Sequence, residues 1–198
     1  MEVNEDSWKE WVSEYIENPN AYGSDALYAY LRHGYKFRAT SVDRIMQILI
    51  LPSFEPAVSY EIFRTRVIKS IDEPITSESI ANKFDVVKTT WHSDTDMQLR
   101  ADNPSDYKPT FTYSKAEVSL NDMETMFNQF KLSIPMWFHP TVEDDYMGLD
   151  GTNYELALGG FFLGVRYRLW SMGPTEWKPI YDATSNATTL LENILTKD

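Results

Sequence analysis

Apolar and polar positions in the first 35 residues repeat with the period of an α-helix. Residues 8–16 carry apolar side chains at spacings of three and four, so these side chains share one helical face. The polar and proline-containing stretch 18–20 ends this helix. A second helix is predicted to begin at Ser24 or Asp25 and to end at Gly34, where glycine can adopt the left-handed C-terminal conformation.

The middle of the chain changes to a two-residue period, which is typical of strands. Residues 45–51 fit both a helical and a strand repeat, and the pattern alone does not choose between them. Residues 57–68 alternate clearly and are rich in β-branched and aromatic side chains. Residues 84–91 and 111–118 are also predicted strands. Residues 92–109 are polar and rich in aspartate, so we expect a long mobile loop.

The remaining helices carry their own boundary signals. Residues 76–82 are predicted as a short helix or a loop. Ser119 is followed three residues later by Asp122, the spacing of a capping box, and an apolar methionine and phenylalanine stripe follows. This helix should end at 133–135. A final amphipathic helix is predicted around 190–195.

Two alternating runs near the C-terminus predict a β-hairpin, with strands over 153–158 and 161–170 joined at Gly159-Gly160. Glu155 and Arg166 would face each other across the paired strands and form an ion pair. Tryptophan and arginine are common anchors of interfaces. The hairpin is therefore a candidate recognition patch, with Asp150, Glu155, Arg166 and Trp170 as its binding residues.

Together these elements predict a single α+β domain over residues 1–198, with a helical part over 1–40 and a sheet-containing part over 41–198. The fold should comprise a mainly antiparallel sheet of about five to six strands. Two N-terminal helices, one inserted helix and a C-terminal helix should accompany it.

Composition narrows the classes of partner. With 30 acidic and 18 basic residues the net charge is -12, which disfavours nucleic acids and anionic membranes and suits a basic protein partner. No cysteine is present, so disulfides, thiolate nucleophiles and zinc–sulfur sites are excluded. The start of the chain does not resemble a secretory signal, and no apolar run is long enough for a membrane helix. We therefore expect a soluble cytoplasmic protein.

Motifs for several chemistries are missing from the sequence. It contains no phosphate-binding glycine loop, no dinucleotide fingerprint, no nucleophile elbow and no H-E-x-x-H motif, and we predict no cofactor. His92, Asp94 and Asp96 would point the same way in an extended chain and form a weak candidate metal site, although the glycine turn of a calcium loop is absent. We therefore predict no metal site, and these three residues stay a weak candidate.

A second histidine lies beside carboxylates, and a histidine in such a position can act as a general base. The residues of this group are His139, Glu143, Asp144, Asp145 and Asp150. No nucleophile or oxyanion donor is positioned by the sequence, so an exposed acidic loop is the simpler interpretation.

Residues 149–156, 166–171 and 173–174 resemble a pattern of uncharacterised bacterial proteins. Those proteins carry a leucine-aspartate-glycine turn, a strand, a second strand with arginine or tyrosine near a tryptophan, and a serine-proline break before a last helix. Met46–Arg66 and Ser119–Trp137 resemble their earlier segments. The resemblance implies an antiparallel sheet with flanking helices, favours a strand at 45–51, and implies no activity.

Two hypotheses of function follow. The first is a non-enzymatic binding protein, of the immunity or inhibitor kind, that uses its acidic surface against a basic protein. The alternative is a hydrolase or small-ligand enzyme that uses His139 or His92 with nearby carboxylates inside a deep pocket.

Overall fold

The chain forms one six-stranded antiparallel sheet with the strand order β4-β3-β2-β1-β5-β6. The computed structural model describes residues 3–15, 24–35, 43–68, 80–102, 108–133, 151–160, 163–171 and 175–197. The strands are β1 (Asp43–Pro52), β2 (Ala57–Ile68), β3 (Ile80–Trp91), β4 (Phe111–Val118), β5 (Thr152–Gly160) and β6 (Leu163–Trp170). The predicted α+β class and antiparallel sheet are confirmed.

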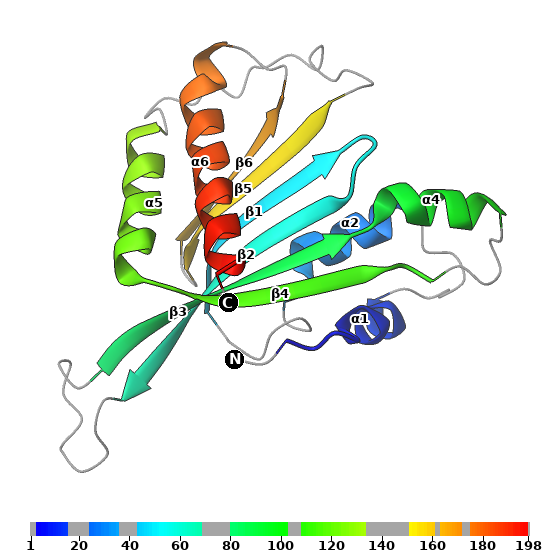
Figure 1. The fold of residues 1–198 in the computed structure, drawn as a ribbon, viewed down its shortest axis with the longest axis horizontal. Coiled ribbons are helices and arrows are strands. Elements are labelled where there is room, and N and C mark those ends of the chain that lie inside the picture. Colours follow the sequence, from blue (N-terminus) through cyan, green and yellow to red (C-terminus); the bar gives the residue numbers. More distant parts are fainter. Residues whose placement is uncertain are drawn as a thin grey trace.

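Helices lie on both faces of this sheet (Figure 1). They are α1 (Ser7–Tyr15), α2 (Ser24–His33), α4 (Ser93–Asp102), α5 (Leu120–Ser133) and α6 (Lys178–Leu195), with the short 3-10 helix η4 (Thr175–Trp177) directly before α6. Helices α5 and α6 lie side by side over one face, and α2 lies behind the strands on the other. Among the described residues, no helix has the length and apolarity needed to cross a bilayer.

The face under α5 and α6 is apolar, as the two-residue repeat requires. Met46 and Ile48 of β1 point toward this face, and so do their counterparts on the neighbouring strands. Helix α5 contributes Met126, and α6 contributes Leu191, which are both fully buried. Alternation along each strand thus directs one set of apolar side chains onto two helical stripes, and this layer is the main core.

Glu192 of α6 makes polar contacts with the sheet in this layer. The Tyr60 hydroxyl and the Lys88 ammonium both donate to the Glu192 carboxylate. Burial alone would raise the pKa of Glu192, but the hydrogen bonds from Lys88 and Tyr60 leave that pKa below its ordinary value. Burial and the Glu192 carboxylate together hold the pKa of the Tyr60 hydroxyl above its usual range.

The opposite face is mixed in character. Leu27 and Leu31 of α2 pack against Leu49 and Trp91 of the sheet. Alongside them the same face buries polar and charged groups, which are Gln47, Ser59, Glu61, Asp85, Thr89 and Glu155. A buried charge is costly unless it is paired. The partners of these groups therefore show which part of the molecule is a candidate functional site.

Several local predictions are confirmed, but the reason for glycine at the end of α2 differs from the predicted one. Residues 45–51 lie in β1, which is the alternative that the resemblance favours. Asp122 N donates to Ser119 Oγ at 3.1 Å, as in a capping box, while the Asp122 carboxylate accepts from the Ser119 hydroxyl at 2.6 Å and not from the Ser119 backbone N–H. Gly34 follows α2 without a positive φ. Glycine is needed there for space, because a Cβ would lie 2.7 Å from the Tyr30 carbonyl oxygen.

The loop predicted for 92–109 is wrong at its start, because Ser93–Asp102 is helix α4. Its acidic first turn suits the positive end of the helix dipole. Buried Asp96 also accepts hydrogen bonds from Trp91 Nε1 and from Thr110 N, both at 2.7 Å, which holds the helix against the end of β3. The stretch 76–82 was expected outside the sheet, but β3 already begins at Ile80.

The C-terminal hairpin exists, but its turn is displaced from the predicted position. Gly159 pairs with Gly164, and Gly160 pairs with Leu163, so both predicted turn glycines belong to β5. The predicted turn at Gly159-Gly160 is therefore wrong, and residues 161–162 lie outside the described part of the chain. Gly159 has φ 129°, a conformation that glycine adopts readily, so the strand end itself requires glycine.

Candidate functional site

Side chains of the sheet cap the C-terminal end of α2. The Gln47 amide donates to the Leu31 carbonyl oxygen at 2.8 Å, and Arg44 donates to the Arg32 carbonyl oxygen at 3.0 Å. The last carbonyls of a helix have no partner within the helix, and cationic donors suit its negative end. These two residues of β1 therefore determine where α2 ends and direct Arg32 toward the sheet.

Glu61 of β2 is the most deeply buried carboxylate in this region. Its side chain is 0% exposed, and its Oε1 accepts a hydrogen bond from Arg44 Nη1 at 2.8 Å. The Arg44 guanidinium also stacks over the Tyr35 ring, 4.3 Å from its centroid. This pair is therefore enclosed on several sides, and its charges are largely compensated within the protein.

Glu155 of β5 forms the second buried ion pair, with Arg32 of α2. Arg32 Nε donates to both carboxylate oxygens at 2.9 Å, and Arg32 Nη2 donates to Oε1 at 2.7 Å. Arg168 Nε lies 3.3 Å from the same Oε1. Two arginines therefore share one carboxylate, and the closer and better aligned of the two comes from the helix.

The predicted partner of Glu155 across the hairpin is wrong. Glu155 is opposite Arg168, and Arg166 is opposite Ala157. The reason is the register of the hairpin, because both predicted turn glycines pair with residues of β6, Gly159 with Gly164 and Gly160 with Leu163. Glu155 and Arg166 still lie on the same face of the sheet, since Ala157 and Glu155 are two residues apart.

These residues form a group that we call the arginine cluster, which comprises Arg32, Arg44, Arg166, Arg168, Glu61 and Glu155. It has four cationic and two anionic side chains, in a protein whose total charge is -12. Among the described residues, the Arg166 side chain has neither a hydrogen bond nor an ion pair, although its backbone pairs with Ala157 of β5. The cluster thus concentrates positive charge at the β5–β6 side of the sheet.

Electrostatics within the cluster reflect this excess. Burial lowers the pKa of the Arg166 guanidinium, Glu155 opposes that change, and the three neighbouring arginines add to it. His33, next to Arg32 at the end of α2, is affected in the same way. Burial lowers the pKa of His33, and Arg166, Arg44 and Arg32 lower it further against the opposing effect of Glu155. The His33 imidazole is therefore a natural reporter of charge in this region.

Three residues on one side of β6 form what we call the β6 stripe, namely Arg166, Arg168 and Trp170. They are two residues apart, so they project from the same face of the strand. The Arg168 side chain is 69% exposed. Trp170 is half-buried and lies so close to Gly151 that a Cβ there would be 2.5 Å from Trp170 Cζ2. The stripe thus joins two cations to a fixed aromatic ring.

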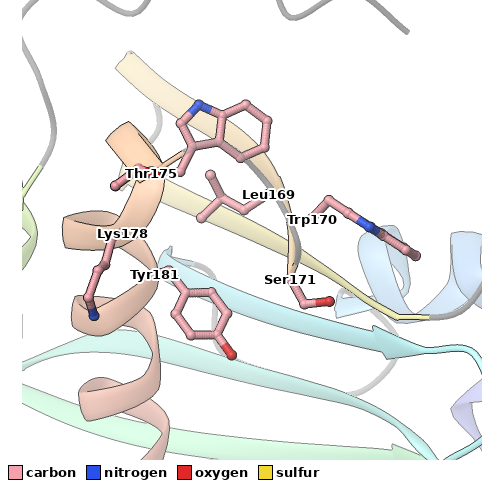
Figure 2. A pocket seen from close by; sticks show the side chains of 7 residues that line it. Leu169, Trp170, Ser171, Thr175, Lys178 and Tyr181 are labelled. Atoms are coloured by element: carbon pink, nitrogen blue, oxygen red, sulfur yellow. The ribbon is translucent and has the colours of Figure 1, made fainter. Parts of the chain in front are cut away.

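A small cavity of about 220 Å³ lies on the other side of β6, between this strand, η4 and the start of α6. Figure 2 shows Leu169 and Tyr181 turned toward it, while the Trp170 indole projects from the opposite side of β6. Lys178 lines it but is held by Asp182 at 2.8 Å. Pockets for drug-sized ligands are usually larger, about 300–1,000 Å³.

The other sequence candidates divide into two groups. His92, Asp94 and Asp96 do not form the extended row that was expected, because the two aspartates lie in α4 and Asp96 binds Trp91 Nε1. His92 Nε2 instead lies 3.2 Å from the Thr112 hydroxyl. Within the described ranges, no three His, Asp or Glu side chains are arranged to hold a metal ion.

The group His139, Glu143, Asp144, Asp145 and Asp150 lies entirely outside the described residues. Sequence reasoning identified Glu155, Arg166 and Trp170 but missed Arg32, Arg44, Glu61 and Arg168. One signal was present for Glu61. A glutamate within a strongly β-forming run that is buried on both faces needs a cationic partner.

Comparison with known proteins adds no relative to this description. No protein-family model, no curated protein and no solved structure matches the chain. The resemblance to uncharacterised bacterial proteins therefore stays a prediction.

Proposed function

We propose that this chain is a non-enzymatic binding protein and that the β6 stripe, supported by the arginine cluster, recognises an anionic group on its partner. The observation that carries the proposal is the charge imbalance. Arg32 occupies both oxygens of Glu155, and Arg166 has no carboxylate partner among the described residues. A carboxylate from outside would find the exposed Arg166 guanidinium beside three other arginines, whose positive charges also attract an anion.

Trp170 supports a recognition role for the same surface. Tryptophan and arginine are enriched among the residues that contribute most to interfaces. Trp170 is held by its contact with the chain at Gly151, so it loses little side-chain freedom when a partner binds. Cations and a rigid aromatic ring along one strand suit an acidic segment with an apolar side chain.

The earlier hypothesis of a basic protein partner depends on the net charge of -12 and stays a prediction. It concerns the whole surface, whereas the arginine cluster is local and has the opposite sign. Because exposed charges more than about 10 Å apart are largely screened at ordinary ionic strength, a local positive site can act within an acidic protein.

The proposal is tested with dye-labelled hexaglutamate and hexalysine, with binding followed by fluorescence anisotropy. We expect hexaglutamate to bind the wild-type protein and to bind the Arg166→Gln variant more weakly. Lys115→Gln, on the far edge strand β4, is the matched control and should bind like the wild type. Equal binding by Arg166→Gln would refute the proposal, and binding of hexalysine alone would favour a basic partner.

A further inference from the structure

The outer edge of β6 has the features of a site for strand addition. Among the described residues, β6 is the last strand on its side of the sheet and pairs only with β5. An edge strand presents backbone N–H and C=O groups that point away from its neighbour. β6 is eight residues long, which is enough to pair with an extended peptide segment.

The charges on β6 indicate which kind of segment could pair with its outer edge. A second copy of β6 placed antiparallel to the first would bring the arginines of both strands onto one face, where like charges repel. The Arg168 side chain is 69% exposed, and its Nε lies as far as 3.3 Å from Glu155 Oε1, so much of its charge faces outward. A strand with acidic side chains at every second position would place a carboxylate beside each arginine.

The other edge of the sheet differs in this respect. Strand β4 carries Lys115 and Glu117 on one face, and Glu117 is paired with Lys83 of β3 at 2.6 Å. The charge of Glu117 is therefore balanced by a neighbour of opposite sign. β6 combines an unpaired edge with a local excess of one charge, and β4 does not.

We propose that an acidic extended segment of a partner protein binds by adding a strand to the outer edge of β6, with its carboxylates opposite Arg166 and Arg168. This inference rests on the proposed function and goes further, because it specifies main-chain pairing as the mode of binding. Main-chain hydrogen bonds would provide affinity, and the β6 stripe would provide the preference for acidic residues at alternate positions.

The test uses a labelled eight-residue peptide that alternates glutamate and valine, with three matched probes. The first replaces glutamate by lysine, the second carries N-methyl groups at alternate peptide bonds, and the third is an oligothymidylate of similar charge. N-methylation removes backbone donors and leaves the side-chain charges unchanged. Anisotropy gives the dissociation constants, and hydrogen–deuterium exchange reports protection of Leu163–Trp170.

We expect the acidic peptide to bind, to slow exchange in β6, and to lose binding on N-methylation. The double variant Arg166→Gln, Arg168→Gln should weaken binding by roughly two- to thirtyfold, from the range measured for two exposed ion pairs. The matched control Lys108→Gln, Lys115→Gln removes the same charge near β4 and should bind like the wild type. Far-UV circular dichroism verifies that both variants are folded.

Each contrary result has a definite meaning. If the N-methylated peptide binds as well as its parent while the arginine variant still weakens both, strand addition is wrong and the proposed function stands. If the acidic peptide does not bind, or binds no better than the lysine peptide, both proposals are wrong. Equal or tighter binding of the oligothymidylate, or self-association through β6 in sedimentation experiments, would also overturn the assignment of an acidic protein segment.

Discussion

Replacement of Glu155 by glutamine tests how much the buried ion pair stabilises the fold. The Glu155 side chain is only 7% exposed and receives three hydrogen bonds from Arg32. Glutamine keeps the volume and one carbonyl acceptor but removes the negative charge. The variant therefore leaves Arg32 next to a neutral amide, with Arg168 the nearest cation.

The expected loss follows from the geometry of the pair. At 2.7 Å, two unit charges attract by about 6 kcal/mol at an effective dielectric constant near 20. Desolvation offsets much of this, and removal of one partner of a buried pair typically costs about 3–5 kcal/mol. Arg32 is 23% exposed, so water solvates part of the remaining charge and the lower value applies. We expect a loss of about 3 kcal/mol, or about 6–12 °C in Tm.

The assay is urea unfolding followed by tryptophan fluorescence, with a thermal melt as a second measurement. Asp182→Asn is the matched control, because Asp182 pairs with Lys178 at 2.8 Å but their side chains are 50% and 68% exposed. An exposed pair within a helix contributes only about 0.3–0.5 kcal/mol. If Glu155→Gln and Asp182→Asn lose the same stability, burial does not determine the strength of these pairs and the reasoning is refuted.

Three further predictions concern the core, the pH dependence and the arginine cluster. Met126→Ala should cost about 2–5 kcal/mol in urea unfolding because it opens a cavity under α5, while Leu132→Ala, at a position 86% exposed, should change stability by less than about 0.5 kcal/mol. Glu192 has a pKa lowered on folding, so its contribution is full above the pKa of the unfolded chain and is lost as pH falls through the folded value. The stability difference between wild type and Glu192→Gln should accordingly shrink on acidification, and a constant difference would contradict the assignment. Arg166→Gln should raise the pKa of His33 in an NMR titration, and an unchanged value would show that the two side chains do not interact.

Local sequence patterns correctly predicted those helices and strands whose structure depends on residues close together in the chain. Alternation predicted β2 and β4, and the capping box at Ser119 predicted the start of α5. The helix α4 was missed because its sequence is polar and has little amphipathic character. Its position depends on Asp96, which reaches Trp91 and Thr110, and no local pattern shows those contacts.

The sequence singled out only some residues of the candidate site, and it did not predict how they pair. Glu155, Arg166 and Trp170 were identified by residue type, but the partner of Glu155 depends on the register of the hairpin, in which Glu155 is opposite Arg168. The strongest partner, Arg32, is 123 residues away along the chain. Its approach requires α2 to cover the sheet beside β5.

The sequence by itself determined the strands with clear alternation and the amphipathic helices, and which face of each is apolar, because side-chain direction follows from the backbone period; it did not determine helix α4 or choose a strand at 45–51. The tertiary structure alone decided which charges are paired. Strand order and the end of α2 bring Arg32 and Arg44 to the buried glutamates, while the Arg166 side chain lacks a hydrogen bond or ion pair within the described part of the chain. Charge pairing depends on distances in space, and those distances exist only once the sheet has assembled.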